Sequence, residues 1–257
     1  MSVDFGFDPA GELTRDGCPV PTLARRLDEL LAIGPACPPY LADREAAETA
    51  VRAGHNPVLY RAVRGANPPR SQGGFVVEAD LVCYEPGELP GGEPFRSTGH
   101  WNLPAQLEVF QTITGRVAML VIGDDYSYVQ VCGPGQAMAV PFGVWHVSYV
   151  VDGPALVFNI TANLAASEAH EDKYQRGAAP PVTLCRRDGR LVAVGPGPTP
   201  VGPPRAEWLG LWLPPGASLA DRHRRAPDDA WLDLAAAAQA AERAQWATRD
   251  GFAAVWQ

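Results

Sequence analysis

Histidine is rare in this chain, and two of its five histidines stand in the most patterned segments. His100 lies in the run Thr-Gly-His-Trp-Asn at 98–102, and Glu108 follows in a run rich in Val, Phe and Thr. His146 follows a glycine turn, a short apolar run and a second turn that contains proline and glycine. Two imidazoles and a carboxylate are a ligand set that divalent transition metals bind. These residue types and spacings therefore predict a metal site, provided that the elements carrying them converge.

The elements that must position these residues are predicted to be β-strands. Short runs rich in Val, Ile, Tyr and Phe, separated by Gly, Pro and Asp, fill residues 57–163. Such a series predicts a mainly β fold, an antiparallel sandwich or barrel. Alternate residues of a strand share a face, so His100 and Asn102 point the same way. In a small barrel, Glu108 and His146 would meet them from neighbouring strands.

The segments before and after this series of strands differ from it in residue composition and in hydrophobic pattern. Leucines at helical spacing in 21–33 and an Ala-rich run in 42–53 predict two short helices. Asp188-Gly189 marks the turn of a further strand pair. Beyond a connector rich in Pro and Gly, a long Ala-rich run with an acidic start predicts a C-terminal helix.

Length and composition set the domain organisation. With 257 residues, 46% of them hydrophobic, the chain has enough apolar material for a substantial core. We expect a helical lead-in over 1–56, a β-barrel over 57–195, and a connector with a helical extension over 196–257. The extension is expected to pack on the barrel or on the partner of a homodimer.

Charge and hydropathy exclude several classes of partner. A formal net charge of −8 argues against nucleic acid, whose phosphates require a basic surface. No run is long and apolar enough to span a membrane, and the first residues lack the features of a signal peptide, so a cytoplasmic location is expected. The five cysteines are scattered and are expected to be reduced and buried. His55 and His223 lie in polar surroundings and are expected to be exposed.

The segments around His100 and His146 resemble the paired motifs of the cupins, and the second segment matches that pattern at every spacing through His146. A closer resemblance covers about residues 5–185. The runs VLYRAV, YEPGEL, TGHWN, LEVFQTITG, VPFGVWH and HEDKYQRG are similar, in that order, to the archaeal-type cupin glucose-6-phosphate isomerases. The resemblance implies a double-stranded β-helix, the jelly-roll barrel of the cupins. It also implies a bound metal and the conversion of an aldose phosphate into a ketose phosphate.

Carried over residue by residue, the resemblance implies that His100, Glu108 and His146 are metal ligands. Asn102 stands where that family has a further histidine and is a weaker candidate ligand. Tyr60 and Tyr174 match inward tyrosines of the family and, with Glu108, are the candidate catalytic residues. The candidate substrate contacts are Ser97, Gly99, Phe110, Trp145 and His170.

The chain departs from that family near the expected phosphate contacts, because Leu81 and Val82 stand where a phosphate-binding isomerase tends to have threonines. A buried phosphate beside aliphatic side chains lacks hydrogen-bond donors, so we expect a substrate that is less charged and more apolar than a sugar phosphate. Phe110 and Trp145 are expected to form its walls.

The leading hypothesis is a metal-dependent cupin enzyme that catalyses isomerisation or related proton transfer on a small sugar-like or carbonyl-containing molecule. One divalent ion is expected, and Fe, Mn, Ni and Zn all accept this ligand set. A first alternative is a non-haem Fe(II) oxygenase or a lyase acting on a natural-product intermediate, because such oxygenases use the same ligands. A second alternative is a cupin that binds a small ligand without catalysis.

Overall fold

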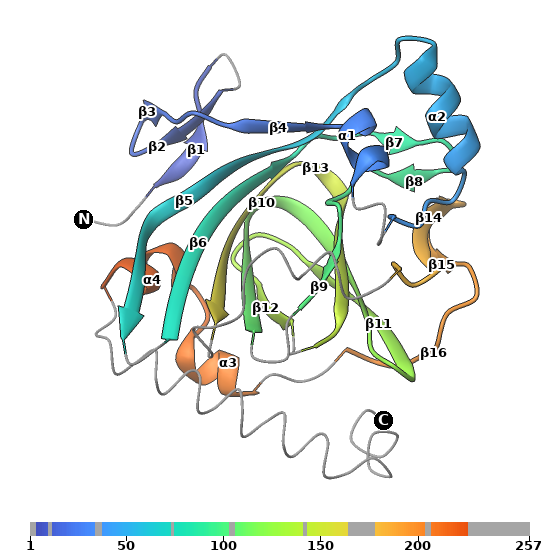
Figure 1. Ribbon diagram of the computed structural model, residues 1–257. Helices are drawn as coiled ribbons and strands as arrows, with labels where there is room; N and C mark the ends of the chain where they lie inside the picture. Colours follow the sequence, from blue (N-terminus) through green and yellow to red (C-terminus); the bar gives the residue numbers. More distant parts are fainter. Residues whose placement is uncertain are drawn as a thin grey trace.

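The computed structural model describes residues 4–9, 12–33, 38–72, 75–102, 106–140, 143–163, 178–203 and 207–225. In these residues the chain is mainly β, with short helices before and after the strands (Figure 1). None of the described helices has the length and apolar character that crossing a membrane requires.

Two long strands form the centre of the fold. β10 (Gln106–Ile122) and β13 (Trp145–Asn163) pair antiparallel over most of their lengths, with register shifts between Thr112 and Val117. Irregularities of this kind let paired strands bend. Gly115 sits at the bend with a φ of 68°, and a Cβ there would lie 2.7 Å from the carbonyl oxygen of Asp152. Glycines were expected to separate short strands, but at this glycine the structure has one continuous bent strand.

Other strands extend the sheet on both sides of the bent pair. They are β4 (Leu23–Arg26), β5 (Val58–Gln72), β6 (Phe75–Tyr84), β9 (His100–Trp101), β11 (Tyr126–Cys132), β12 (Ala137–Val140) and β16 (Thr199–Pro200). One half of the β10–β13 pair lies between β12 and β6, and the other half lies between β11 and β9. The bent strands therefore contribute one half to each of two layers of the folded sheet, which is the jelly-roll architecture that was predicted.

The face of β6 and of the adjoining half of β13 that points away from the predicted metal site is covered by the first strands and by two short helices that follow the sheet in the sequence. Leu81 and Phe158 pack there with Leu209 and Leu219 from two short helices. These helices are α3 (Glu207–Trp212) and α4 (Leu219–Arg225), and small strands lie nearby at β1 (Phe5–Phe7), β2 (Leu13–Arg15) and β3 (Cys18–Pro19). Burying each of these leucine and phenylalanine side chains contributes about 1.5–3 kcal/mol to the free energy of folding.

A hairpin packs against the outer face of the other half. It consists of β14 (Thr183–Arg187) and β15 (Arg190–Val194), and its turn contains Asp188 and Gly189, both with positive φ. The turn confirms the hairpin that the Asp-Gly pair predicted. Val182 and Leu184 pack on Trp145 in a third hydrophobic cluster. A further pair of short strands, β7 (Glu88–Leu89) and β8 (Glu93–Pro94), lies beside this hairpin (Figure 1).

The N-terminal segment is only partly helical, which corrects the expected helical lead-in. The helix predicted over 21–33 begins only at Leu27 as α1 (Leu27–Ala32), because the preceding β4 pairs through its main chain with β5. The second predicted helix is present as α2 (Arg44–Arg52), and the Asp43 side chain accepts a hydrogen bond from the backbone nitrogen of Ala46 at its start. The long helix predicted near the C-terminus lies outside the described residues.

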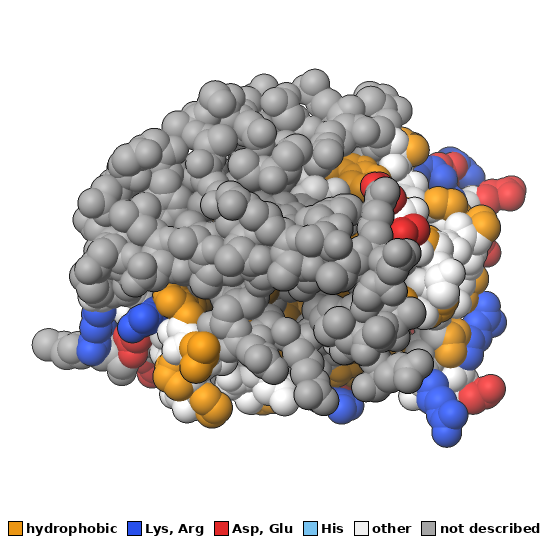
Figure 2. Space-filling view, turned by 90° about the horizontal axis from the view of Figure 1, so that it is seen from below, with side chains coloured by type: hydrophobic (Ala, Val, Ile, Leu, Met, Phe, Trp, Pro, Cys, Tyr) orange, Lys and Arg blue, Asp and Glu red, His pale blue; other side chains and the backbone are white. Residues whose placement is uncertain are grey.

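The described surface is mixed in character. On the face shown in Figure 2, hydrophobic, basic and acidic side chains lie beside one another at the margins. Of the cysteines in the described part of the chain, Cys83, Cys132 and Cys185 are buried and Cys18 is exposed. Burial raises the pKa of the Cys132 thiol to about 11, so this thiol is protonated and unreactive at neutral pH.

Candidate metal centre

Three strands bring the predicted ligands together. His100 on β9 is the cross-strand partner of His146 on β13, and Glu108 lies on β10, which pairs with β13 on the other side. Nε2 of His100 lies 3.1 Å from one oxygen of the Glu108 carboxylate, and Nε2 of His146 lies 3.3 Å from the other oxygen. The two imidazole rings are 4.3 Å apart between centroids. Both rings therefore present a nitrogen to the same carboxylate.

The three side chains fit a metal ion. Their candidate ligand atoms all lie within 4.8 Å of one another, which is close enough for the three side chains to hold one ion. Glu108 is 2% exposed and His146 is 3% exposed, whereas His100 is only partly buried. A carboxylate as deeply buried as Glu108 requires a compensating charge, which a divalent ion supplies. Two histidines and one carboxylate also leave coordination positions for water or substrate.

Asn102 lies close to this cluster along the chain and is fully buried. Its backbone nitrogen donates to the carbonyl oxygen of Val144 at 2.8 Å. Its side-chain nitrogen donates to the carbonyl oxygen of Val140, at 3.4 Å, and Val140 is the cross-strand partner of Glu108. The amide is thus oriented by the strand next to Glu108, and direct coordination by Asn102 stays a prediction.

The cluster lies in the wall of a cavity of about 80 Å³ between the two sheets. Among the residues predicted from the sequence, Tyr60, Ser97 and Phe110 line this cavity, and the ring of Phe110 packs edge-on against His146 with centroids 5.9 Å apart. Most other lining residues carry hydrogen-bonding groups, and sequence reasoning missed them. They include Arg64, Glu78, Asp80, Tyr84, Ser148 and Asn159.

Polar and apolar residues alternate along β6, and this pattern in the sequence could have revealed part of the cavity wall. Glu78 and Asp80 line the cavity, while Val77, Ala79 and Leu81 between and beside them are buried in the core behind the sheet. Leu81 therefore has no contact with the cavity, and only Val82 of the two predicted aliphatic residues lines it. Half of the reasoning for a more apolar substrate therefore rested on a side chain that faces the other way, and the nature of the substrate stays a prediction.

Other predicted substrate contacts lie elsewhere. Trp145 precedes the inward His146 and packs on the outer face of the sheet, so it does not wall the cavity. Gly99 has a φ of 71°, and a Cβ there would lie 2.7 Å from the Trp145 ring, which gives this glycine a structural role. His170 and Tyr174 lie outside the described residues.

Tyr84 is a buried phenol in the cavity wall. Burial raises its pKa above that of a free tyrosine, and hydrogen bonds from Ser148 and Ser97 oppose this rise only partly. Tyr84 therefore stays protonated at neutral pH and can donate a hydrogen bond. The Tyr60 ring lies 5.8 Å away between centroids, so the two phenols stand side by side at one end of the cavity.

A buried ion pair holds the segment that leads to His100. Arg96 and Glu93 are both at most 1% exposed and are joined at 2.8 Å. Arg96 also donates to the carbonyl oxygens of Ser97, at 3.0 Å, and Thr98, at 3.3 Å. The Glu93 carboxylate accepts a hydrogen bond from the Thr183 hydroxyl at 2.6 Å. The backbone immediately before His100 is thus fixed from inside the protein.

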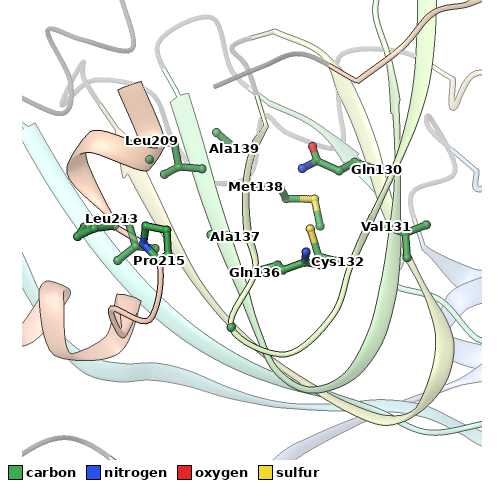
Figure 3. A pocket seen from close by; sticks show the side chains of 13 residues that line it. Gln130, Val131, Cys132, Gln136, Ala137, Met138, Ala139, Leu209, Leu213 and Pro215 are labelled. Atoms are coloured by element: carbon green, nitrogen blue, oxygen red, sulfur yellow. The ribbon is translucent and has the colours of Figure 1, made fainter. Parts of the chain in front are cut away.

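A second hollow of about 460 Å³ lies between β11, β12 and α3 (Figure 3). Met138, Cys132, Gln130, Leu209 and Leu213 are among its lining residues. Apart from the protonated Cys132, the described side chains that line it do not titrate, and none of them is a group for acid–base chemistry or for binding a divalent ion. The smaller cavity at the histidines is therefore the candidate site.

The fold and the three-residue cluster together define a jelly-roll protein with a candidate site for one divalent metal ion. No protein-family model and no curated protein matches the chain. The solved structures similar to it include a recombinant oxalate oxidase in complex with glycolate. That match has 17% identity and a TM-score of 0.29, and it covers 34% of this chain and 42% of the other. The chain thus spans less than half of that protein.

Two further similar structures have comparable scores. KdgF from Halomonas sp. has 15% identity and a TM-score of 0.31 over 41% of this chain and 81% of that one. A variant of oxalate decarboxylase from Bacillus subtilis has 14% identity and a TM-score of 0.30 over 45% of this chain and 32% of that one. At scores this low the likenesses carry no argument about activity, so the function is argued from the site itself.

Proposed function

We propose that this chain is a metal-dependent enzyme that moves a proton within a small carbonyl-containing, sugar-like substrate, as in the interconversion of an aldose and a ketose. The observation that carries this proposal is the convergence of His100, Glu108 and His146 in a cavity whose other walls are rich in hydroxyl, amide and carboxylate groups. A polyhydroxylated substrate matches such walls, because each of its hydroxyls both donates and accepts hydrogen bonds.

The metal and the protein contribute differently. A divalent ion held by His100, Glu108 and His146 would polarise the carbonyl group and lower the cost of negative charge on its oxygen. Both oxygens of Glu108 face the imidazoles, so we assign Glu108 to holding the ion. Tyr84, kept protonated by burial, is placed to donate a hydrogen bond to a substrate oxygen. Tyr60 beside it is the candidate for proton transfer, with Tyr174 a further candidate outside the described residues.

A second candidate function keeps the site and changes the reaction. Two histidines and one carboxylate are also the ligands of non-haem Fe(II) oxygenases, so an oxidation or a lyase reaction on a natural-product intermediate fits the same cluster. A cupin that only binds a small ligand is the remaining alternative. The homodimer and the cytoplasmic location stay predictions.

Isotope exchange tests the proposal. Protein purified without chelator is analysed for Fe, Mn, Ni and Zn, loaded with the metal found, and incubated in D₂O with simple aldoses and ketoses. We expect about one ion per chain and deuterium incorporation beside the carbonyl carbon, both lost in His146→Ala. Oxygen consumption without deuterium incorporation would favour the oxygenase, and protein without any transition metal would favour a binding function.

A further inference from the structure

We propose that Glu78 and Asn159, which line the same cavity as the metal ligands, form a subsite for uncharged hydroxyl groups of the substrate and select against its phosphate ester. This inference rests on the proposed function in one respect, namely that the other end of the substrate lies at the His–Glu cluster. It names residues that neither the motifs nor the resemblance indicated.

The strand register places this subsite relative to the metal ligands. Glu108 of β10 is paired with Thr161 of β13, and Thr161 is paired with Glu78 of β6. These three residues therefore form a row across neighbouring strands, and two strand spacings of about 4.8 Å separate the ends of the row. A substrate of several carbon atoms that is bound at the cluster extends along this row towards Glu78. The next row contains Phe110, Asn159 and Asp80 in the same order.

Asn159 supplies the observation that points to a ligand. Its side chain lines the cavity, the residue is 8% exposed, and its amide oxygen has no hydrogen-bond partner among the described residues. Leaving a buried acceptor unpaired costs stability, so such a group in a cavity wall indicates that a bound molecule satisfies it. An amide offers both an acceptor and donors, and a hydroxyl is the group that matches both.

The charges around Asn159 decide what kind of ligand is accepted. The carboxylate of Asp80 is occupied, because one oxygen pairs with the Arg64 guanidinium and the other accepts from the backbone nitrogen of Gly65 at 3.0 Å. Among the described residues, Asp80 thus offsets the positive charge of Arg64. Glu78 forms no ion pair with a described side chain, and among the described residues that line this end of the cavity it adds one negative charge. A phosphate dianion placed here would be repelled, whereas a hydroxyl would donate to the carboxylate.

A matched pair of ligands tests the subsite. D-Fructose and D-fructose 6-phosphate differ only in the phosphate, and their dissociation constants are measured by calorimetry on the metal-loaded protein at low salt. We expect the phosphate ester to bind at least about tenfold more weakly than the free sugar, because like charges meet without screening. Glu78→Gln removes one exposed carboxylate and should narrow this ratio, while Glu12→Gln, which removes an exposed carboxylate elsewhere, should leave it unchanged. Asn159→Ala should weaken binding of fructose by about tenfold.

The outcomes separate this inference from the proposed reaction. Metal content is measured for each variant, and because Glu78 is exposed, Glu78→Gln should fold and load metal like the parent. Equal or tighter binding of the phosphate ester, a ratio unaffected by Glu78→Gln, or no binding of either sugar would overturn the subsite. Fructose binding without deuterium exchange would instead leave the subsite standing and contradict the proposed reaction.

Discussion

At the scale of single residues, the site depends on three side chains whose nitrogen and oxygen atoms meet on one face of the fold. The shared carboxylate of Glu108 lies within 3.3 Å of both imidazoles, so each ligand also orients the others. Loss of one ligand therefore removes a bond to the metal and leaves Glu108 more weakly compensated in a buried position.

Replacing either metal-ligating histidine tests this arrangement. His100→Ala and His146→Ala are each expected to lower metal affinity by at least about a hundredfold. Even residues that only hydrogen-bond to metal ligands change metal affinity by about 10–100-fold when they are replaced. Metal content after gel filtration and a competition titration with a chelator provide the measurement. His55→Ala is the matched control, because His55 is exposed and far from the cluster in the sequence. Full metal occupancy in both ligand variants would contradict the site.

Asn102 offers a second test at this scale. If its amide oxygen coordinates the metal, Asn102→His should raise affinity measurably, because imidazole is the better donor for this class of ion. The same chelator competition measures the change. Unchanged affinity would restrict Asn102 to its hydrogen bond with the Val140 carbonyl oxygen.

At the scale of elements, the metal ligands come from three strands that the protein must hold in register. β9 contains only His100 and Trp101, and it is too short to hold its own position. The buried pair of Arg96 and Glu93 anchors the backbone just before it, through the carbonyl oxygens of Ser97 and Thr98.

Arg96→Lys should therefore affect both stability and the metal site. An ammonium cannot reproduce the planar set of donors that reaches several carbonyl oxygens, and a poorly paired Glu93 is costly at this depth. We expect a loss of about 3 kcal/mol in the free energy of unfolding, together with weaker metal binding by the protein that remains folded. Urea unfolding and chelator competition measure the two effects. A stability loss with unchanged metal affinity would show that the pair does not position His100.

The bend of the two long strands makes a separate prediction. At Gly115, the positive φ and the close approach of the Asp152 carbonyl oxygen leave no room for a methyl group. Gly115→Ala should lower the free energy of unfolding by about 1–3 kcal/mol, as measured by urea unfolding. Gly133→Ala is the control, because a Cβ there would have its nearest neighbour at 3.6 Å and its φ is not positive. Equal effects of the two substitutions would contradict this account of the bend.

At the scale of the whole molecule, two β-layers enclose the site, and each of them is covered on its outer face. The inner faces of the two sheets form the cavity, and their outer faces are covered by the short helices on one side and by the β14–β15 hairpin on the other. Several tyrosines are buried between these layers, and burial raises the pKa values of Tyr84, Tyr128 and Tyr149.

These tyrosines predict a loss of stability at alkaline pH. For Tyr149, burial raises the pKa to about 12 from 10.0, so above pH 10 the unfolded chain loses a proton that the folded chain keeps. Stability that is fully present below pH 10 is therefore lost as the pH rises towards 12, by up to about 1.4 kcal/mol per pH unit for each such tyrosine. Tyr149→Phe should flatten this dependence in urea unfolding between pH 9 and pH 11.5. An unchanged slope in Tyr149→Phe would show that this phenol does not titrate differently in the two states.

The chemistry of the site and the kind of element that carries it could be predicted from the sequence alone. The alternation of apolar residues and the Gly and Pro turns indicate strands, and local spacing places His100, Glu108 and His146 in separate strands. The Asp188-Gly189 turn is equally local, and the structure contains it. Such features depend on backbone preferences of a few neighbouring residues, so they can be read without knowing the fold.

Tertiary structure alone decided which side chains share a face across strands that are distant in the sequence. Pairing register turned Leu81 and Trp145 away from the cavity and brought Glu78 and Asn159 into it. Packing also buried His223 completely on α4, contrary to the exposure expected from its polar neighbours, whereas His55 is exposed as predicted. In the strands, a shift of register by one residue would move each side chain to the opposite face of the sheet. The register depends on the apolar area that all strands bury together. This burial energy comes from contacts between distant parts of the chain, so it cannot be inferred from the sequence of a single strand.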